Sequence, residues 1–398
     1  MTPCDFIAIG LFWIGFGCPF FVFVLYPGFL FLGCHATPGK NNHNNGFNLP
    51  SISVLVVFRN SQDLLEEKIK NFSALDYPKE KLELIMVSDG STDRSIEIIE
   101  MAKSLPIKLY NLYNHQGKIS GLNFGVEKCS NDIILFSDAD AILEIYALRK
   151  IVRHFCNPLI GGVCGKRLIN EGLSKTQAGQ EKFIQWDTMI KSLEMKSGIS
   201  ITSNDGKIYA IRKRLFLPVR PGVTDDAYIA LSIIQQKYRF VFEPKAIAFI
   251  KKPSRYTMHE LVRRKRIVST SLTGLKHHIG LFNPFKYGFF SFGLFINKVL
   301  RRMIPFALIL ILLTSLILSL NNYIAATLFF RLQITGYMFF LLYPAIISRL
   351  PDNPFWVQII KKLGSIGYFF CVGMAGTFIG VLTFLSGRKI SKWEPIKK

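Results

Sequence analysis

The chain has 398 residues, of which 49% are apolar, and it carries a formal net charge of +22 at pH 7. This length allows one large domain with several membrane spans, or two domains, and so basic a charge excludes a protein buried wholly in lipid. Basic chains suit anionic lipids, phosphorylated substrates or nucleic acids, but RGG repeats, zinc-finger spacings and aromatic-rich strand motifs are missing from the sequence, so no nucleic-acid partner is expected.

Seven cysteines are distributed along the chain with irregular spacing, and the sequence contains no Cys-x-x-Cys pair. An odd number without a regular pattern indicates neither a disulfide framework nor a zinc site. We therefore expect reduced thiols, as in a domain that faces the cytosol.

The first 34 residues are expected to form a transmembrane helix. The run from Phe6 to Gly33 contains no charged residue and exceeds the roughly 20 residues that a span requires. A cleaved signal peptide would have a basic start and an apolar region of only about 7–15 residues, whereas residues 1–5 contain no base. A retained span is therefore the better interpretation.

Apolar stretches return near the C-terminus. Residues 304–386 contain three expected spans, at about Ile304–Leu320, Tyr323–Ile347 and Ile366–Leu385. Only the second contains a charged residue, Arg331, which should snorkel or face other helices. Before them, residues 256–303 mix bases with Phe and Leu, a pattern typical of interfacial amphipathic helices.

The positive-inside rule places the basic middle of the chain in the cytoplasm of an integral plasma-membrane or inner-membrane protein. One span before that section and three after it would leave the C-terminus outside. The tail at residues 387–398 nevertheless carries five bases and one acid. Either an interfacial stretch crosses the membrane, or one predicted span does not, or the tail breaks the rule.

Residues 35–50 are expected to form a polar linker, and residues 51–255 alternate strand and helix patterns. Apolar β-branched runs predict strands at Ile52–Phe58, Leu82–Val87, Ile107–Leu112 and Ile133–Phe136. Amphipathic segments between them predict helices at Gln62–Ala74, Ser95–Ser104 and Lys118–Lys128. Buried strands separated by helices predict a doubly wound α/β sheet, which binds its ligands at the carboxyl ends of the strands.

Acidic residues stand at two of these strand ends. Asp89 follows the second strand, where a turn is the simpler interpretation because Asp-Gly favours turns. Asp138 and Asp140 follow the fourth strand, and two carboxylates one residue apart repel each other unless a cation lies between them. A hard divalent metal that carries a diphosphate would meet this need. Lys118, at the start of a helix, adds a second positive group for phosphate.

Two later blocks carry further candidate groups. Asp205 and Gly206 lie in a turn that enters a strand. Asp225 and Asp226 begin a helix, where acids often serve only to interact with the helix dipole, but one of them could act as a general base for an acceptor hydroxyl. The four consecutive bases at residues 263–266 suit a lipid-facing surface or, through arginine, a diphosphate.

Taken in order, these blocks resemble the family-2 glycosyltransferases with the GT-A fold. The resemblance runs from about Ser51 to Ile267 and is closest to the membrane-embedded branch that contains exopolysaccharide, hyaluronan, chitin and cellulose synthases. It implies an α/β fold with a GT-A (Rossmann-like) cytoplasmic domain at residues 51–255, between N- and C-terminal transmembrane helices.

The resemblance implies an inverting hexosyltransferase that depends on Mg²⁺ or Mn²⁺. Its donor would be a nucleotide-sugar, expected to be a UDP-sugar, and its acceptor a glycan or a lipid-linked molecule. Cell-surface or exopolysaccharide synthesis is the implied role. Membrane lipid and a partner subunit for export would be its further partners.

The resemblance also implies a role for each residue at a matching position. Donor contacts would come from Phe58, Arg59, Asp89, Lys118, Asp138, Arg263 and Arg266. Asp89 would lie on the uracil, Arg263 and Arg266 would hold the diphosphate, and Asp140 would ligate the metal. Asp226 would be the general base, and the acceptor would contact Asp205, Gly206 and Asp225.

Two positions depart from the family pattern. Ser61 stands where the strand-one motif usually has Glu, and residues 263–267 replace the usual Gln by Arg263 and the usual Trp by Ile267. In processive synthases that Trp borders the acceptor terminus, so its loss favours a non-processive enzyme that adds one sugar to a lipid acceptor.

Two other classes of protein are alternatives. A haloacid-dehalogenase-type phosphohydrolase also uses Asp-x-Asp after a strand, but it needs Gly or a hydroxyl residue next, where Ala141 stands. A non-catalytic membrane partner with the same fold would not need all the acids that this chain retains.

Overall fold

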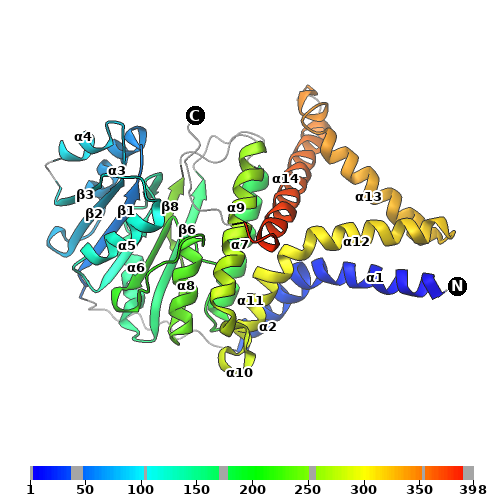
Figure 1. Ribbon diagram of the computed structural model, residues 1–398, viewed down its shortest axis with the longest axis horizontal. Helices are drawn as coiled ribbons and strands as arrows, with labels where there is room; N and C mark the ends of the chain where they lie inside the picture. Colours follow the sequence, from blue (N-terminus) through cyan, green and yellow to red (C-terminus); the bar gives the residue numbers. More distant parts are fainter. Residues whose placement is uncertain are drawn as a thin grey trace.

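The computed structural model describes residues 3–36, 48–102, 105–169, 178–250, 257–351 and 355–388. It contains an α/β domain, a layer of helices beside that domain, and a set of long apolar helices that projects from this layer (Figure 1). The predicted linker and the predicted basic tail lie largely outside the described residues.

The α/β domain is built on an eight-stranded sheet with the strand order β3-β2-β1-β4-β7-β6-β8-β5. The strands are β1 (Ile52–Phe58), β2 (Leu82–Asp89), β3 (Ile107–Leu112), β4 (Ile133–Ser137), β5 (Ala141–Leu143), β6 (Ile160–Ile169), β7 (Ile208–Arg212) and β8 (Arg239–Ile250). Strands β1 to β4 are parallel, as predicted, but β7 runs antiparallel between β4 and β6. Because the chain returns through β7 in the opposite direction, the sheet is mixed, and the predicted Rossmann-like α/β fold is confirmed.

The helices of the domain are α3 (Gln62–Ala74), α4 (Ser95–Glu100), α5 (Lys118–Lys128), α6 (Ala147–Val152), α7 (Ala178–Lys196) and α8 (Asp225–Gln235). The structure confirms the predicted limits of β1, β3, α3 and α5. Strand β2 extends to Asp89, so this residue ends the strand and does not lie in the turn after it.

Helix α5 lies unusually close to the sheet because glycines face the strand beneath it. A Cβ atom added to Gly121 would lie 2.7 Å from Cγ1 of Val57, and one added to Gly125 would lie 2.5 Å from Cδ1 of Leu55. Real Cβ atoms essentially never make contacts under 3.0 Å, so a larger residue at either position would require the side chain beneath it or α5 itself to shift. The close approach places the N-terminus of α5, and with it Lys118, directly above the end of β1.

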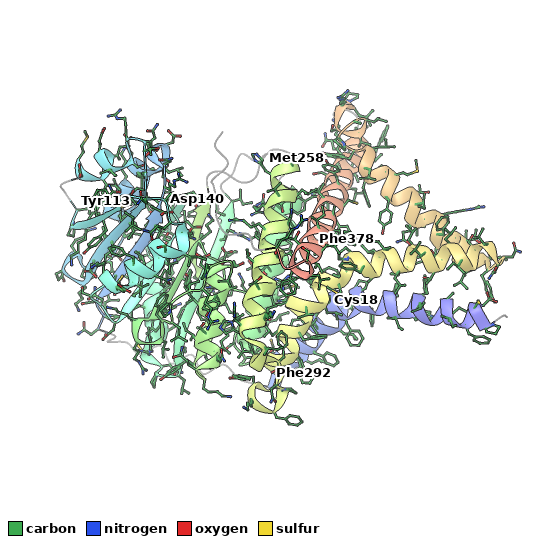
Figure 2. All side chains as sticks on the ribbon, in the orientation of Figure 1. Cys18, Tyr113, Asp140, Met258, Phe292 and Phe378 are labelled. Carbon is green, nitrogen blue, oxygen red and sulfur yellow. The ribbon has the colours of Figure 1, made fainter. Side chains whose placement is uncertain are left out.

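Four helices among the described residues are long and apolar enough to cross a membrane: Pro3–Cys34, Phe289–Leu320, Ile324–Leu342 and Phe355–Leu385. The first combines α1 (Pro3–Phe20), η1 (Phe21–Leu25) and α2 (Tyr26–Ala36), and the second combines α11 (Phe289–Leu294), η7 (Phe295–Leu300) and α12 (Arg301–Leu320). The others are α13 (Ile324–Leu342) and α14 (Phe355–Leu385). Helices α1 and α12 lie side by side (Figure 1). Sγ of Cys18, which is labelled on α1 in Figure 2, contacts the carbonyl oxygen of Leu300.

The segment predicted to be interfacial divides into two parts. Helices α9 (Thr257–His277) and α10 (Pro284–Tyr287) precede the apolar helices, but Phe289 begins the helix that continues to Leu320. Residues 289–303 therefore belong to the same helix as the predicted span, and no break separates them at residue 303. The apolar Phe and Leu side chains of this stretch continue the apolar surface of α12.

Helix α14 packs along α9 (Figure 1). A Cβ atom added to Gly376 would lie 2.9 Å from Cβ of Arg264, and one added to Gly380 would lie 2.8 Å from the carbonyl oxygen of Lys265. These two glycines let the backbones of the two helices touch. The last two turns of α14 therefore lie against the helix that carries the predicted diphosphate-binding arginines.

Candidate functional site

The candidate site lies where the carboxyl ends of β1, β2 and β4 meet the first residues of α5 and α8. A small pocket there is lined by Leu55, Val57, Lys118, Leu122, Phe136, Ser137, Asp138, Gly206, Tyr209 and Asp225. The apolar residues come from the strands and from α5, and the charged residues stand at the ends of these elements. Lys118, Asp138, Gly206 and Asp225, which the sequence analysis selected separately, are therefore brought together by the fold.

Two lysines hold the carboxylates that follow β4. Nζ of Lys118 lies 2.8 Å from Oδ1 of Asp138 and 2.9 Å from Oδ2 of Asp225. Nζ of Lys207 lies 3.0 Å from Oδ2 of Asp138. The same atom lies 2.6 Å and 2.8 Å from the two carboxylate oxygens of Asp140, which is labelled in Figure 2. Burial alone would raise the pKa of Asp138, but the two ammonium groups outweigh it and hold that pKa far below its usual range.

The donor set fits a hard divalent cation that is completed by its substrate. No group of three or more His, Cys, Asp or Glu side chains that could hold a metal occurs among the described residues. Mg²⁺ is commonly held by one or two carboxylates, with water and substrate phosphates supplying the other oxygens. The pair Asp138 and Asp140 matches this pattern, so a metal here would need a phosphate-bearing partner.

Lys68, which was not among the predicted site residues, supports the same turn from inside the domain. Its side chain is fully buried, and Nζ donates to Oγ of Ser137 at 2.7 Å and to the carbonyl oxygen of Ala141 at 2.5 Å. Burial lowers the pKa of Lys68 to about 7. The one signal in the sequence was a lysine on the apolar stripe of α3, between Leu65 and Phe72.

Asp89 anchors the loop that leads into α5. Its carboxylate accepts hydrogen bonds from the backbone N–H of Gln116 at 2.8 Å and of Gly117 at 2.9 Å, and it lies 2.8 Å from Nδ1 of His115. These contacts fix the backbone one residue before Lys118. The predicted contact of Asp89 with a uracil ring stays a prediction.

Gly90 offers a test of this loop. Its φ is +64°, and an added Cβ would lie 2.7 Å from the backbone nitrogen of His115. We expect Gly90→Ala to destabilise the protein by more than about 1 kcal/mol, because strain and a backbone clash add. Gly222→Ala is the matched control, since Gly222 has φ of +78° but nothing within 4 Å of an added Cβ. Thermal unfolding of both variants would contradict this account if they lost equal stability.

The acidic pair at the start of α8 contains the group best placed to act as a base. Oδ1 of Asp226 accepts from the backbone N–H of Ala227 at 2.7 Å, and an added Cβ on Gly206 would lie 3.2 Å from Oδ2. A larger residue at position 206 would crowd this second oxygen, since a contact of 3.2 Å is tighter than nine in ten real Cβ contacts. Burial, followed by the nearby charges of Asp225 and Asp205, raises the pKa of Asp226 to about 7.

Asp205 is held beside this pair by an ion pair with Arg167. Oδ2 of Asp205 lies 3.1 Å from Nε of Arg167. The neighbouring Asn204 donates from Nδ2 to the carbonyl oxygen of Asp226 at 3.0 Å. The turn at residues 204–206 and the start of α8 therefore form one wall, and sequence reasoning missed Arg167 because its partner is distant in the chain.

The two predicted diphosphate-binding arginines of α9 differ in their surroundings. Arg263 pairs with Glu260 at 2.8 Å, one turn earlier on its own helix. Burial lowers the pKa of Arg266, while the carboxylates of Asp225, Asp138 and Asp226 act in the opposite direction. Arg266 thus faces the acidic site, whereas the charge of Arg263 is neutralised by Glu260.

A hydroxyl contact fixes α9 against α8. Oγ1 of Thr270 lies 2.8 Å from Oγ1 of Thr224, the residue before Asp225. Thr270 lies one turn after Arg266 on α9, so this contact fixes the position of Arg266 along α9 relative to Asp225 and Asp226.

Phe58 and Arg59 stand at the end of β1, as predicted. Phe58 is buried in the core, and the buried Nε of Arg59 has no hydrogen-bond partner in the part of the chain that the structure describes. A nucleotide contact of Phe58 and Arg59 stays a prediction.

All seven cysteines are free.

Comparison with known sequences identifies similar proteins. The family model described as "Glycosyl transferase family 2" matches residues 53–217. Poly-beta-1,6-N-acetyl-D-glucosamine synthase from Staphylococcus aureus (strain MSSA476) is 25% identical over 213 residues, which cover 52% of this chain and 51% of that protein. The Staphylococcus epidermidis protein of the same name is 24% identical over 222 residues, covering 54% and 52%. The chain spans about half the length of the curated relatives it matches.

Comparison with solved structures shows the fold. The mannosyltransferase PcManGT from Pyrobaculum calidifontis, solved in complex with GDP-Man and Mn²⁺, matches with a TM-score of 0.70 at 19% identity. The match covers 97% of this chain and 99% of that one. Agreement over so much of both chains confirms the predicted GT-A architecture together with its apolar helical extensions.

Proposed function

We propose that this protein transfers a sugar from a nucleotide-sugar donor to a glycan or lipid-linked acceptor at a membrane, since residues 53–217 match the family model described as "Glycosyl transferase family 2". The observation that carries the proposal is the cluster at the strand ends. It combines a carboxylate pair suited to a cation, a lysine suited to phosphate, and Asp226, whose pKa burial raises to about 7.

On the donor side, the residues of the site would stabilise the negative charge of the donor's diphosphate. Asp138 and Asp140 would hold Mg²⁺ or Mn²⁺, which would neutralise the diphosphate of the bound donor. Lys118 and Arg266 stand beside the same carboxylates, where negative charge grows on the departing nucleoside diphosphate. The name of the curated relatives favours a UDP-activated sugar, and the GDP-Man of the solved structure makes a GDP-sugar the competing donor.

On the acceptor side, Asp226 takes the proton. As the acceptor hydroxyl attacks the anomeric carbon, its proton moves to the Asp226 carboxylate and the bond from that carbon to the diphosphate oxygen breaks. A single displacement of this kind inverts the anomeric centre. Gly206 and Asp205 border the same carboxylate and would contact the acceptor.

We place the α/β domain on the cytoplasmic side. Arg301 and Arg302, at the start of α12, lie directly before its apolar residues, and the positive-inside rule assigns such bases to the cytoplasmic side.

The direct test supplies the full chain, in a membrane fraction that contains glycan and lipid-linked acceptors, with UDP-N-acetylglucosamine, UDP-glucose and GDP-mannose in the presence of Mn²⁺. We expect release of nucleoside diphosphate from one donor, and loss of that release on chelation by EDTA. The proposal fails if no donor is turned over by a folded preparation.

A second candidate is addition of a single sugar in place of a polymer. It is favoured by Ile267, which replaces the Trp expected at the acceptor terminus. Mass spectrometry of the products would show one added sugar per acceptor. A ladder of chain lengths would contradict the addition of a single sugar.

The raised pKa of Asp226 gives a pH prediction. The usual pKa of Asp is about 3.9, and only the carboxylate form can accept a proton. We therefore expect kcat/KM to fall about tenfold per pH unit below the raised pKa of about 7, and to be level above it. Initial rates between about pH 5 and pH 9 would show this, and a profile that stays flat down to about pH 5 would contradict the assignment.

The two arginines of α9 should differ in their effect on rate. We expect Arg266→Gln to lower kcat by about 10²–10³ because it removes positive charge where the leaving group develops. Arg263→Gln should lower kcat by less than about tenfold, since Arg263 is paired with Glu260. If the two variants lost kcat equally, as measured at saturating donor, the different roles assigned to Arg266 and Arg263 would be refuted.

A further inference from the structure

Four basic side chains gather where the α/β domain meets the apolar helices. Arg264 comes from α9, Lys298 from η7, and Arg301 and Arg302 from the start of α12. We call them the junction cluster. Only 9% of Arg302 is exposed, the side chain of Arg264 is 16% exposed, and the other two residues are partly buried. These charges are therefore largely shielded from water.

Three of these bases donate hydrogen bonds to uncharged groups. Lys298 donates to Oγ of Ser203 at 3.1 Å, Arg301 to Oδ1 of Asn297 at 3.1 Å, and Arg302 to Oγ of Ser271 at 2.7 Å. Within the described part of the chain, none of the three forms an ion pair.

The nearby acids are already engaged. Arg264 pairs with Glu260 at 3.1 Å, but Glu260 also pairs with Arg263 at 2.8 Å. Asp187, which lies close enough to act on Lys298 and Arg301, is bound to Lys191 at 2.7 Å. Positive charge therefore exceeds negative charge in this partly buried region.

Two members of the cluster converge on one aromatic ring. The guanidinium carbon of Arg264 lies 4.7 Å from the ring centroid of Phe183, and that of Arg301 lies 4.8 Å from the same centroid. Nε of Arg264 is buried without a hydrogen-bond partner among the described residues. Two guanidinium groups held together in this way repel each other, and an anion between them would relieve the repulsion.

Phosphate is the anion that this arrangement fits. Arginine binds phosphate oxygens through two parallel N–H donors, and a planar guanidinium stacked on a ring is oriented before the ligand arrives. Several positive groups without carboxylate partners suit a ligand that carries more than one negative charge.

The position of the cluster indicates how such a phosphate would arrive. Lys298 contacts Ser203, and the next residue, Asn204, contacts the backbone of Asp226. Arg301 and Arg302 begin the long apolar helix α12. The cluster therefore lies between the proposed general base and the apolar helices, on the acceptor side and apart from Asp138 and Asp140.

We propose that the junction cluster binds the phosphate of a lipid-phosphate acceptor, whose apolar chain lies along the membrane helices. This inference rests on the proposed glycosyl transfer and names the class of acceptor for it. The phosphate is held at the membrane surface, and a sugar that it carries presents its hydroxyl to Asp226.

The test measures lipid binding separately from catalysis. The full chain in nanodiscs of neutral phosphatidylcholine is titrated with a polyprenyl phosphate, the corresponding polyprenol, phosphatidylglycerol, or inorganic phosphate. We expect the polyprenyl phosphate to bind at least about tenfold more tightly than the polyprenol. Arg301→Gln and Lys298→Gln should abolish this preference. Arg349→Gln, at an exposed residue of η8 (Ile347–Arg349), is the control and should retain it.

Each other outcome overturns a stated part of the proposal. Equal binding of polyprenyl phosphate and polyprenol by the wild-type chain overturns the phosphate site, whether or not the variants fold. Equal competition by phosphatidylglycerol or by inorganic phosphate overturns the assignment to a lipid-phosphate acceptor. Loss of all donor turnover with phosphate-dependent lipid binding intact would instead count against the proposed glycosyl transfer.

Discussion

Replacement of Asp226 by Asn is expected to lower kcat by about 10²–10⁴ while leaving donor binding intact. The amide keeps the size of the side chain, and its oxygen still accepts from the N–H of Ala227, so the start of α8 should be preserved. The amide cannot take a proton from the acceptor hydroxyl. Single-turnover rates with bound donor, together with the donor KM, would measure the effect.

Two controls separate the loss of a base from a loss of structure. Asp63→Asn changes an exposed acid in the first turn of α3, outside the site, and should leave kcat unchanged. The Asp226→Asn protein should unfold at or above the wild-type temperature, since it removes a buried charge beside Asp225 and Asp205. An active Asp226→Asn enzyme would remove Asp226 from the mechanism.

Replacement of Lys207 by Met is expected to raise the affinity of the free protein for Mn²⁺ at least about tenfold. The ammonium group of Lys207 contacts both oxygens of Asp140 and one of Asp138. A metal at the same carboxylates would compete for these oxygens and meet repulsion of roughly 4 kcal/mol per unit charge at about 4 Å. Titration of Mn²⁺ followed by electron paramagnetic resonance reads the affinity without any turnover.

The matched control is Lys245→Met, which removes an exposed lysine from β8 and should leave Mn²⁺ affinity unchanged. Asp140→Asn in the Lys207→Met background should remove the gain. If Lys207→Met instead weakens Mn²⁺ binding, Lys207 orients the carboxylates for the metal and does not compete with it.

Local sequence pattern predicted the first half of the α/β domain well. Strands β1 and β3 and helices α3 and α5 have the predicted limits because each is defined by its own periodicity and its own end signals. The acids at strand ends could be grouped because parallel strands share one carboxyl edge. The comparisons bear out the fold and the enzyme family, and the roles of single residues stay predictions.

What could not be predicted depends on pairing between distant segments. Lys207 reaches Asp140 because β7 inserts antiparallel beside β4, and no local pattern encodes that insertion. In the sequence, Lys68 is a base on the apolar face of α3 without a visible partner. Its hydrogen-bond acceptors lie about 70 positions later in the chain. The difference between Arg263 and Arg266 follows from the orientation of α9, which a run of four bases does not reveal.

The contact between α9 and α14 ties the donor site to the mechanics of the bilayer. Because Gly376 and Gly380 bring the backbones together, a shift of α14 must either carry α9 with it or open the contact. Helices adapt to bilayer thickness mainly by tilting, so a tilt of α14 with this contact closed would move the helix that carries Arg266. We therefore expect the rate of the proposed transfer to depend on the thickness of the surrounding lipid as long as the contact between α9 and α14 stays closed.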